Sequence, residues 1–221
     1  MLRDLVIRNR SIRRFREDVP VDLAVLRELV DLARLTPSAA NRQPLRYLLS
    51  ADPTFNQRIF PHLQWAGYLR DWPGPAAGER PAAYVVVLGD ARIADPVRWD
   101  DAIAAQTMLL GATERGIGGC IIASLDRTQL QASLGLDPSL RILLVVALGV
   151  PAETVVLEDL PADGSIEYWR DDDGVHHVPK RSLDDVIVPH GGSDGTGGSD
   201  GSDGTGGSGG SGGSDGSGDD R

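Results

Sequence analysis

The stretch Arg8-Asn9-Arg10-Ser11-Ile12-Arg13-Arg14-Phe15 places four arginines within seven positions of a chain whose formal net charge is −10. Arginine guanidinium groups bind phosphate or carboxylate through forked hydrogen-bond donors, so this local reversal of charge predicts a site for an anion. The alternative is a solvated basic helix end, because runs of charge usually face solvent. Other segments of the chain must supply partners for the anion if the first interpretation is correct.

The chain has 221 residues, and its last 31 differ from the rest. Residues 191–221 contain only Gly, Ser, Thr and Asp before the final Arg221. None of these residues can build a core, so we expect a flexible, disordered tail. Residues 1–190 are then predicted to form one folded domain.

The distribution of charge disfavours a general nucleic-acid binder. The tail holds six Asp and one Arg, which leaves a net charge of −5 for residues 1–190. A broad phosphate-neutralising surface does not suit an acidic domain, whereas a confined basic pocket for one small anion remains compatible. Of the 22 basic residues, 21 are Arg and one is Lys180.

Cysteine usage and hydropathy predict a soluble, cytoplasmic protein with no membrane partner. Cys120 is the single cysteine, so the chain can form no intramolecular disulfide, and no metal-thiolate spacing exists. The first residues lead into an amphipathic segment rather than an apolar signal core. No apolar run approaches the roughly 20 residues that a bilayer-spanning helix needs.

Hydrophobic spacing indicates alternating helices and strands. Apolar residues at helical spacing predict helices over residues 2–9, 22–35, 54–69, 99–115 and 127–134. Asp22 and Asp126 are candidate N-caps. Apolar runs predict strands over residues 46–50, 83–88, 120–124 and 141–148, and Asp173-Gly174 predicts a hairpin turn. The segment 65–80 is expected to form a pocket rim, with aromatic residues that stack on a ligand or cover an interface.

Three segments are candidates for binding an anion or a heterocycle. The loop 37–44 is bracketed by prolines, and amide side chains on such a loop offer both a donor and an acceptor to the edge of a planar ring. An ordinary polar turn is the alternative. Together, the three segments suit a phosphorylated planar cofactor, and their candidate residues are Arg10, Ser11 and Arg13; Ser38, Asn41 and Gln43; and Lys180 and Arg181.

Other patterns carry little chemistry. Gly116-Ile117-Gly118-Gly119 is preceded by a predicted helix and followed by a strand, the reverse of a dinucleotide-binding turn. His176 and His177 are adjacent on a strand and point to opposite faces, which disfavours a shared metal. Cys120 is interpreted as a small buried thiol. No nucleophile-elbow pattern is present.

Four motifs, in order, resemble the FMN-dependent nitroreductase family. Residues 10–15 are similar to its opening R-S-x-R-x-F pattern, and residues 37–44 to its P-S-x-x-N-x-Q-P loop. The turn at 116–120 resembles a later glycine turn, and Lys180-Arg181-x-Leu183 resembles a basic terminal clamp. The resemblance implies an α+β fold with a mostly antiparallel central sheet flanked by helices. It also implies a homodimer with two FMN sites at the subunit interface.

The resemblance also implies roles for individual residues. Arg10, Ser11, Lys180 and Arg181 would contact the FMN phosphate, and Arg13 would lie near the N1–C2 carbonyl edge of the flavin. The remaining implied cofactor-binding residues are Ser38, Asn41 and Gln43 near the ring, and Ile122, Ala123 and Ser124 near its N5 and O4. No acid, base or nucleophile is required from the chain, because the flavin carries the redox chemistry and Arg13 tunes it.

The implied activity is reduction of a small acceptor, such as a nitroaromatic, quinone or enone, by NAD(P)H in a ping-pong cycle. The chain departs from common family patterns at Asn9, Leu45 and Ala123, which leaves the substrate open. A specialised flavin reaction such as reductive dehalogenation is one alternative. A flavin-binding protein without turnover is another, and a third is an oligomeric α+β protein without flavin.

Overall fold

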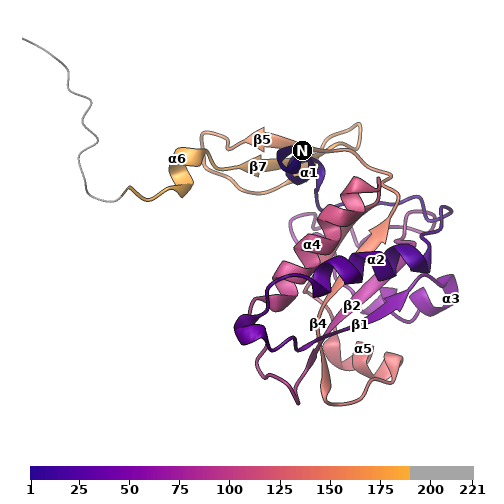
Figure 1. The fold of residues 1–221 in the computed structure, drawn as a ribbon. Helices are drawn as coiled ribbons and strands as arrows, with labels where there is room; N and C mark the ends of the chain where they lie inside the picture. Colours follow the sequence, from indigo (N-terminus) through magenta and orange to yellow (C-terminus); the bar gives the residue numbers. More distant parts are fainter. Residues whose placement is uncertain (190–221) are drawn as a thin grey trace, which may run out of the picture. The chain divides into compact units, whose positions relative to one another are not determined.

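A four-stranded antiparallel sheet forms the centre of the fold in the computed structural model, which describes residues 1–189 (Figure 1). Every neighbouring pair in this sheet is antiparallel, and the strand order is β1 (Leu45–Ser50), β2 (Ala83–Asp90), β4 (Leu140–Gly149) and β3 (Gly118–Ile122). All eight residues of β2 are buried, because helices and loops cover both faces of the sheet. The predicted α+β class with an antiparallel sheet flanked by helices is confirmed.

Helices α2 (Leu23–Arg34) and α4 (Asp100–Glu114) cover one face of the sheet. Val85 and Val87 of β2 point to this face, as expected from the two-residue period of a strand. Leu26 and Leu29 of α2 are fully buried against them. The Asp22 carboxylate accepts a hydrogen bond from the Ala24 backbone N–H, which confirms the predicted N-cap.

The opposite face holds a second apolar cluster. Tyr84 and Val86 of β2 pack there with Ile59 and with Leu130 of α5 (Arg127–Leu134). The Asp126 carboxylate caps α5 by accepting a hydrogen bond from the Gln129 backbone N–H. The predicted helix is therefore confirmed, together with its cap.

The helix predicted over residues 54–69 is wrong. The structure forms α3 (Pro53–Asn56), then a 3-10 turn, η2 (Phe60–His62), and no further helix up to residue 69. Pro61 cannot donate a backbone hydrogen bond and disfavours helical geometry in the residue before it. Ala66 also has a positive φ of 35°, which no right-handed helix allows.

A second, three-stranded sheet follows the first. Its order is β5 (Val155–Asp159), β7 (His176–Lys180) and β6 (Trp169–Arg170), with β5 parallel and β6 antiparallel to β7. The Gly174 backbone N–H donates to the Asp171 carbonyl and Gly174 has φ +78°, so the predicted turn between β6 and β7 is confirmed. Two short helical elements precede β1 in the chain: α1 (Leu2–Arg8) and the 3-10 turn η1 (Ala39–Asn41).

Glycines just before and within β3 allow the backbone to turn and to pack closely against its neighbours. A Cβ atom on Gly119 would lie 2.5 Å from the Ala147 carbonyl oxygen of β4, and Gly116 has φ +73°. Ser11 forms an isolated parallel bridge with Gly119, and Phe15 is fully buried nearby against Gly149. The arginine-rich stretch is therefore held along the edge strand β3, with Phe15 as its core residue.

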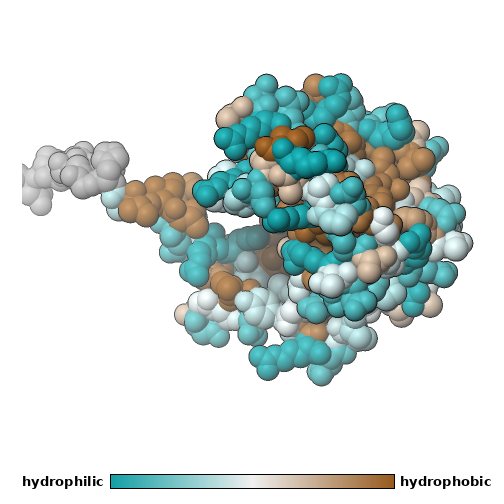
Figure 2. Space-filling model, turned by 90° about the horizontal axis from the view of Figure 1, so that it is seen from below, coloured by the Kyte–Doolittle hydropathy of each residue, from teal (hydrophilic) through white to brown (hydrophobic). Residues whose placement is uncertain are grey.

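The chain divides into two compact units, Met1–Ser182 and a second that begins at Leu183. Of the second unit, the described part includes α6 (Leu183–Val186) and carries four exposed apolar residues, which include the brown stretch before the grey atoms in Figure 2. The predicted tail, 191–221, lies outside the described residues, so the domain assignment stays a prediction. None of the helices within residues 1–189 is both long and apolar enough to cross a bilayer.

Candidate functional site

A cavity of about 300 Å³ lies between the arginine-rich stretch, α4, β3 and the second sheet. We call it the anion cavity. Four of the residues predicted from the sequence line it: Arg10, Ser11, Arg13 and Lys180. Its other lining residues are Asn9, Gln106, Leu109, Ile121, Tyr168, His176 and Val178.

Arg10 brings an incompletely paired guanidinium group to this cavity. Its Nη2 donates to the Val6 carbonyl at 2.6 Å, but its buried Nε has no hydrogen-bond partner among residues 1–189. Burial also lowers the pKa of the Arg10 side chain. An unpaired buried donor is costly, so an anion that accepts from it would be stabilised.

Arg13 lies on an aromatic wall of the anion cavity. Its guanidinium carbon is 5.2 Å from the centroid of the Tyr168 ring, within cation–π range, and its Nη1 donates to the Ser11 carbonyl at 3.3 Å. Tyr68 packs edge-on against Tyr168 at 5.0 Å. The predicted rim segment 65–80 therefore contacts the wall of the cavity through Tyr68.

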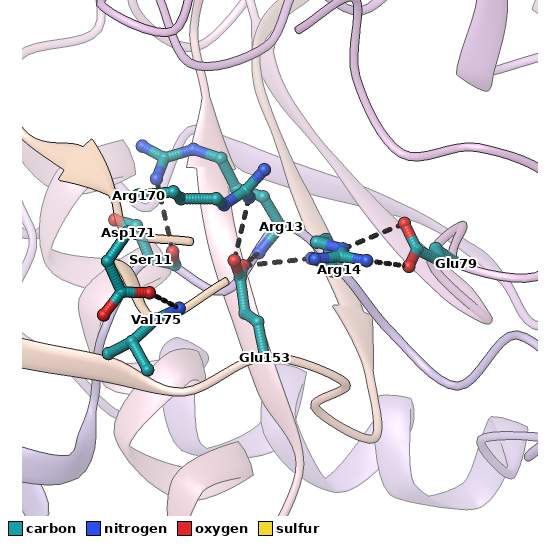
Figure 3. Close-up of polar contacts among 8 residues, drawn as sticks. All are labelled: Ser11, Arg13, Arg14, Glu79, Glu153, Arg170, Asp171 and Val175. Atoms are coloured by element: carbon teal, nitrogen blue, oxygen red, sulfur yellow. Dashed lines mark hydrogen bonds and ion pairs between the residues drawn. The ribbon is translucent and has the colours of Figure 1, made fainter. Parts of the chain in front are cut away.

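A buried carboxylate that the sequence did not indicate fixes this arrangement (Figure 3). The Glu153 side chain is 1% exposed. One of its oxygens accepts from the backbone N–H groups of Arg13 and Arg14, and the other accepts from the Arg170 guanidinium at 2.8 Å. Glu153 lies about 140 positions from Arg13 in the chain, so no local spacing could reveal the contact.

Arg14, another arginine of the stretch, forms an ion pair with Glu79. Its guanidinium forms two parallel hydrogen bonds with the Glu79 carboxylate (Figure 3). Hydrogen bonding to Arg14 lowers the pKa of Glu79. Arg170 lies over the Trp72 ring at 4.3 Å. These contacts attach residues 72–79 to the arginine-rich stretch and to β6.

The two adjacent histidines have different environments. His176 is 1% exposed and lines the anion cavity, and its ring nitrogens have no hydrogen-bond partner within residues 1–189. Burial lowers its pKa to about 4. His177 contacts Glu158 at 2.7 Å and Asp171 at 3.1 Å, and these hydrogen bonds raise its pKa. No metal-ligating cluster occurs in this described part of the chain.

The predicted loop residues lie away from the anion cavity within one chain. The Ser38 hydroxyl donates to the buried carboxylate of Asp100, at 2.5 Å, and accepts from the Gln43 backbone N–H. Ser38 and Gln43 line a separate cavity of about 160 Å³. Asp100, which lines this cavity, begins α4, and Gln106, which lines the anion cavity, lies six residues or about 9 Å further along the helix axis.

The remaining predicted residues do not line the anion cavity. Ile122 is buried, and its neighbour Ile121 reaches the cavity instead. The Ser124 hydroxyl donates to the Gln64 side chain at 2.6 Å, and the Ala123 carbonyl accepts from Arg127. Arg181 and Asn41 are exposed, and the Asn41 side chain accepts from Gln43. The cofactor roles predicted for all these residues stay predictions.

The chain is similar to several known proteins. A model of the nitroreductase family matches residues 7–150. An NADH dehydrogenase of Thermus thermophilus is 29% identical over 175 residues, which cover 66% of this chain and 85% of that protein. A nitroreductase family protein from Streptococcus pneumoniae superposes with a TM-score of 0.59 at 16% identity, covering 86% of this chain and 100% of that one. A gut-bacterial enone reductase, CLA-ER, gives 0.60 at 18% identity, covering 73% and 93%.

The matched region includes the anion-cavity residues of the N-terminal stretch and the whole central sheet. The fold is that of the nitroreductase-family structure named above. Because the family model spans more than half of the chain, the protein belongs to the nitroreductase family. It is accordingly an oxidoreductase.

Removal of the Glu153 carboxylate should destabilise the fold. Glu153→Ala leaves two backbone donors and the Arg170 guanidinium without their acceptor, so we expect a loss of about 3 kcal/mol in the free energy of unfolding. Urea denaturation measures it. The matched control, Glu167→Ala, changes an exposed side chain and should stay within about 0.5 kcal/mol. A loss of less than about 0.5 kcal/mol in Glu153→Ala as well would show that the buried carboxylate is dispensable.

The buried His176 should make the fold less stable in acid. Its folded pKa, about 4, lies below its ordinary value, so the fold favours the neutral ring. Its contribution is complete above about pH 6.5 and falls as the pH drops towards 4, by about 3 kcal/mol in all. His176→Phe should flatten this part of a plot of melting temperature against pH.

His177→Phe is the matched control for the acid effect. The raised pKa of His177 has the opposite sign: its stabilisation is complete below about pH 6.5 and is lost as the pH rises through the raised value. This variant should therefore still lose folding stability as the pH falls from 6.5 to 4, as the unmodified protein does. A His176→Phe profile parallel to that of the unmodified protein between pH 6.5 and 4 would contradict the assignment.

Proposed function

We propose that the protein is an FMN-dependent oxidoreductase in which NAD(P)H and a small acceptor, such as a nitroaromatic, quinone or enone, bind in turn in a ping-pong cycle. The observation that carries the proposal is the anion cavity. Three cationic side chains and one hydroxyl converge on it from segments 170 residues apart: Arg10, Arg13, Lys180 and Ser11. A bound flavin would supply the electron-transfer chemistry.

The residues of the anion cavity suit the phosphate end of FMN. A phosphate monoester carries about −1.5 to −2 charges at neutral pH and accepts several hydrogen bonds. Arg10 has an unpaired donor, and Ser11 and Lys180 add a hydroxyl and an ammonium group. We infer that these three residues and Arg181 hold the phosphate. Arg13 would stabilise negative charge at the N1–C2 edge of the ring.

A second copy of the chain would complete the site. The anion cavity, at about 300 Å³, is at the small end of the roughly 300–1,000 Å³ of ligand cavities, and the Ser38 loop lies apart from it. Leu2, Val6 and Ile7 of α1 are 45–67% exposed. Ile103 of α4 and Ile121 of β3 are 39% and 40% exposed. We propose a homodimer that buries these groups and brings Ser38, Asn41 and Gln43 to the flavin.

Similar proteins support the choice of reaction. Their names include an NADH dehydrogenase and an enone reductase, which agree with nicotinamide oxidation and with reduction of a conjugated acceptor. The chain carries Leu45 and Ala123 beside the predicted ring-binding residues. We propose that these two side chains would leave room for an acceptor above the ring. Ile122, Ala123 and Ser124 are proposed to approach N5 and O4 through their backbone.

The visible spectrum of the purified protein tests the proposal. We expect flavin absorbance that bleaches when NADH or NADPH is added without oxygen, and that returns when a quinone or an enone follows. Size-exclusion chromatography with light scattering should report a dimer. A colourless protein that FMN cannot reconstitute would remove the flavin assignment. Bound flavin that neither nicotinamide reduces would instead indicate a binding protein without turnover.

Arg13→Ala should retain FMN but slow its reduction. Glu153 holds the backbone N–H of residue 13, so the substitution removes the guanidinium without releasing the chain. Loss of one cation near the ring should lower the rate of anaerobic reduction by about tenfold or more. Stopped-flow absorbance measures the rate. Arg27→Ala, on the exposed face of α2, should behave like the unmodified protein. Equal rates in all three proteins would show that Arg13 does not act on the ring.

A further inference from the structure

A third cavity, of about 810 Å³, opens on the face of the central sheet that carries Tyr84. It shares no lining residue with the anion cavity. Its lining combines apolar and polar side chains, and four prolines restrict the backbone around it. The wall residues that matter are Phe60, Tyr84 and the prolines at 20, 53, 61 and 81.

Arg80 brings a positive charge with no carboxylate partner into this cavity. Its guanidinium carbon lies 4.5 Å from the centroid of the Phe60 ring, and its buried Nε has no hydrogen-bond partner in the described part of the chain. No carboxylate oxygen within residues 1–189 lies within 4.0 Å of its nitrogens. Arg14 and Arg170 nearby are both paired, whereas the donors of Arg80 remain available to a ligand.

The Glu17 carboxylate also lines this cavity, and no basic side chain of the described residues balances its charge. One of its carboxylate oxygens accepts from the backbone N–H groups of Gly78 and Arg80, at 2.5 and 3.3 Å. These bonds orient the carboxylate but leave its charge unbalanced, since no basic group of the described chain lies within 4.0 Å. Asp18 adds a second, exposed carboxylate at the rim. Opposite charges therefore line one cavity without pairing with each other.

We propose that this cavity binds a small zwitterion with an aromatic body, of the amino-acid class. Arg80 takes the carboxylate through its free donors, and Glu17 takes the ammonium group. Phe60, Tyr84 and the proline walls cover the apolar body. Glu17 is solvent-exposed and Arg80 carries a buried unpaired donor, so a ligand with both charges pairs with both side chains, whereas a ligand with one charge pairs with only one of them.

Three ligands with the same indole body test the proposal: L-tryptophan, indole-3-propionate, which lacks the amine, and tryptamine, which lacks the carboxylate. Binding to the full chain is measured by isothermal titration calorimetry, with saturation-transfer NMR of the ligand for weak binding. We expect L-tryptophan to bind at least about tenfold more tightly than either analogue. Equal affinity for L-tryptophan and one analogue, or binding of none of the three, would overturn the proposal.

Two variants assign the charges. Arg80→Met keeps the aliphatic stem on Phe60 and should abolish the preference for L-tryptophan over tryptamine. Glu17→Gln keeps an oxygen for the two backbone donors and should abolish the preference over indole-3-propionate. Arg27→Met is the control and should bind like the unmodified protein. Unchanged preferences in variants whose circular dichroism is native would also overturn the assignment. None of these binding measurements involves flavin, so their outcome does not depend on whether the proposed function is correct.

Discussion

The arrangement of the anion cavity depends on one buried carboxylate. Glu153 accepts from two consecutive backbone N–H groups and from a guanidinium, which supplies the donors that a charge in the interior requires. Its contacts join the N-terminal stretch to the connection between β4 and β5 and to β6. The positions of Arg10 and Arg13 follow from this, because their backbone is fixed between Glu153 and the bridge to Gly119.

Local sequence patterns predicted much of the fold, but they could not predict contacts between residues that are far apart in the chain. The caps Asp22 and Asp126 are confirmed, because a cap and its helix lie within three residues. The helix over 54–69 failed because apolar spacing outweighed Pro61 in the prediction. Tyr168 and His176 line the cavity, and Glu153 holds the backbone of Arg13 beside it, each from a position about 140 or more residues away from Arg13, so no local spacing connects them with it.

The candidate site separates into two halves within one chain. Arg10, Ser11, Arg13 and Lys180 lie around one cavity, as the motifs at the two ends of the folded sequence predict. Ser38 and Gln43 are held elsewhere by the carboxylate of Asp100, at the start of α4. A sequence motif states which residues belong together in a family, but not whether one chain or two chains supply them. That distinction depends on packing between elements.

The position of Lys180 has a practical consequence for how the protein is handled. Lys180 lines the anion cavity at the end of β7, and the second unit begins three residues later, at Leu183. A fluorophore or a surface linkage introduced just after residue 182 would therefore be joined to the cavity by a very short piece of backbone. The single lysine of the chain also offers amine-reactive reagents one side chain, apart from the amino terminus, and that side chain belongs to the cavity. Amine labelling of the side chains of this molecule is therefore directed at the cavity.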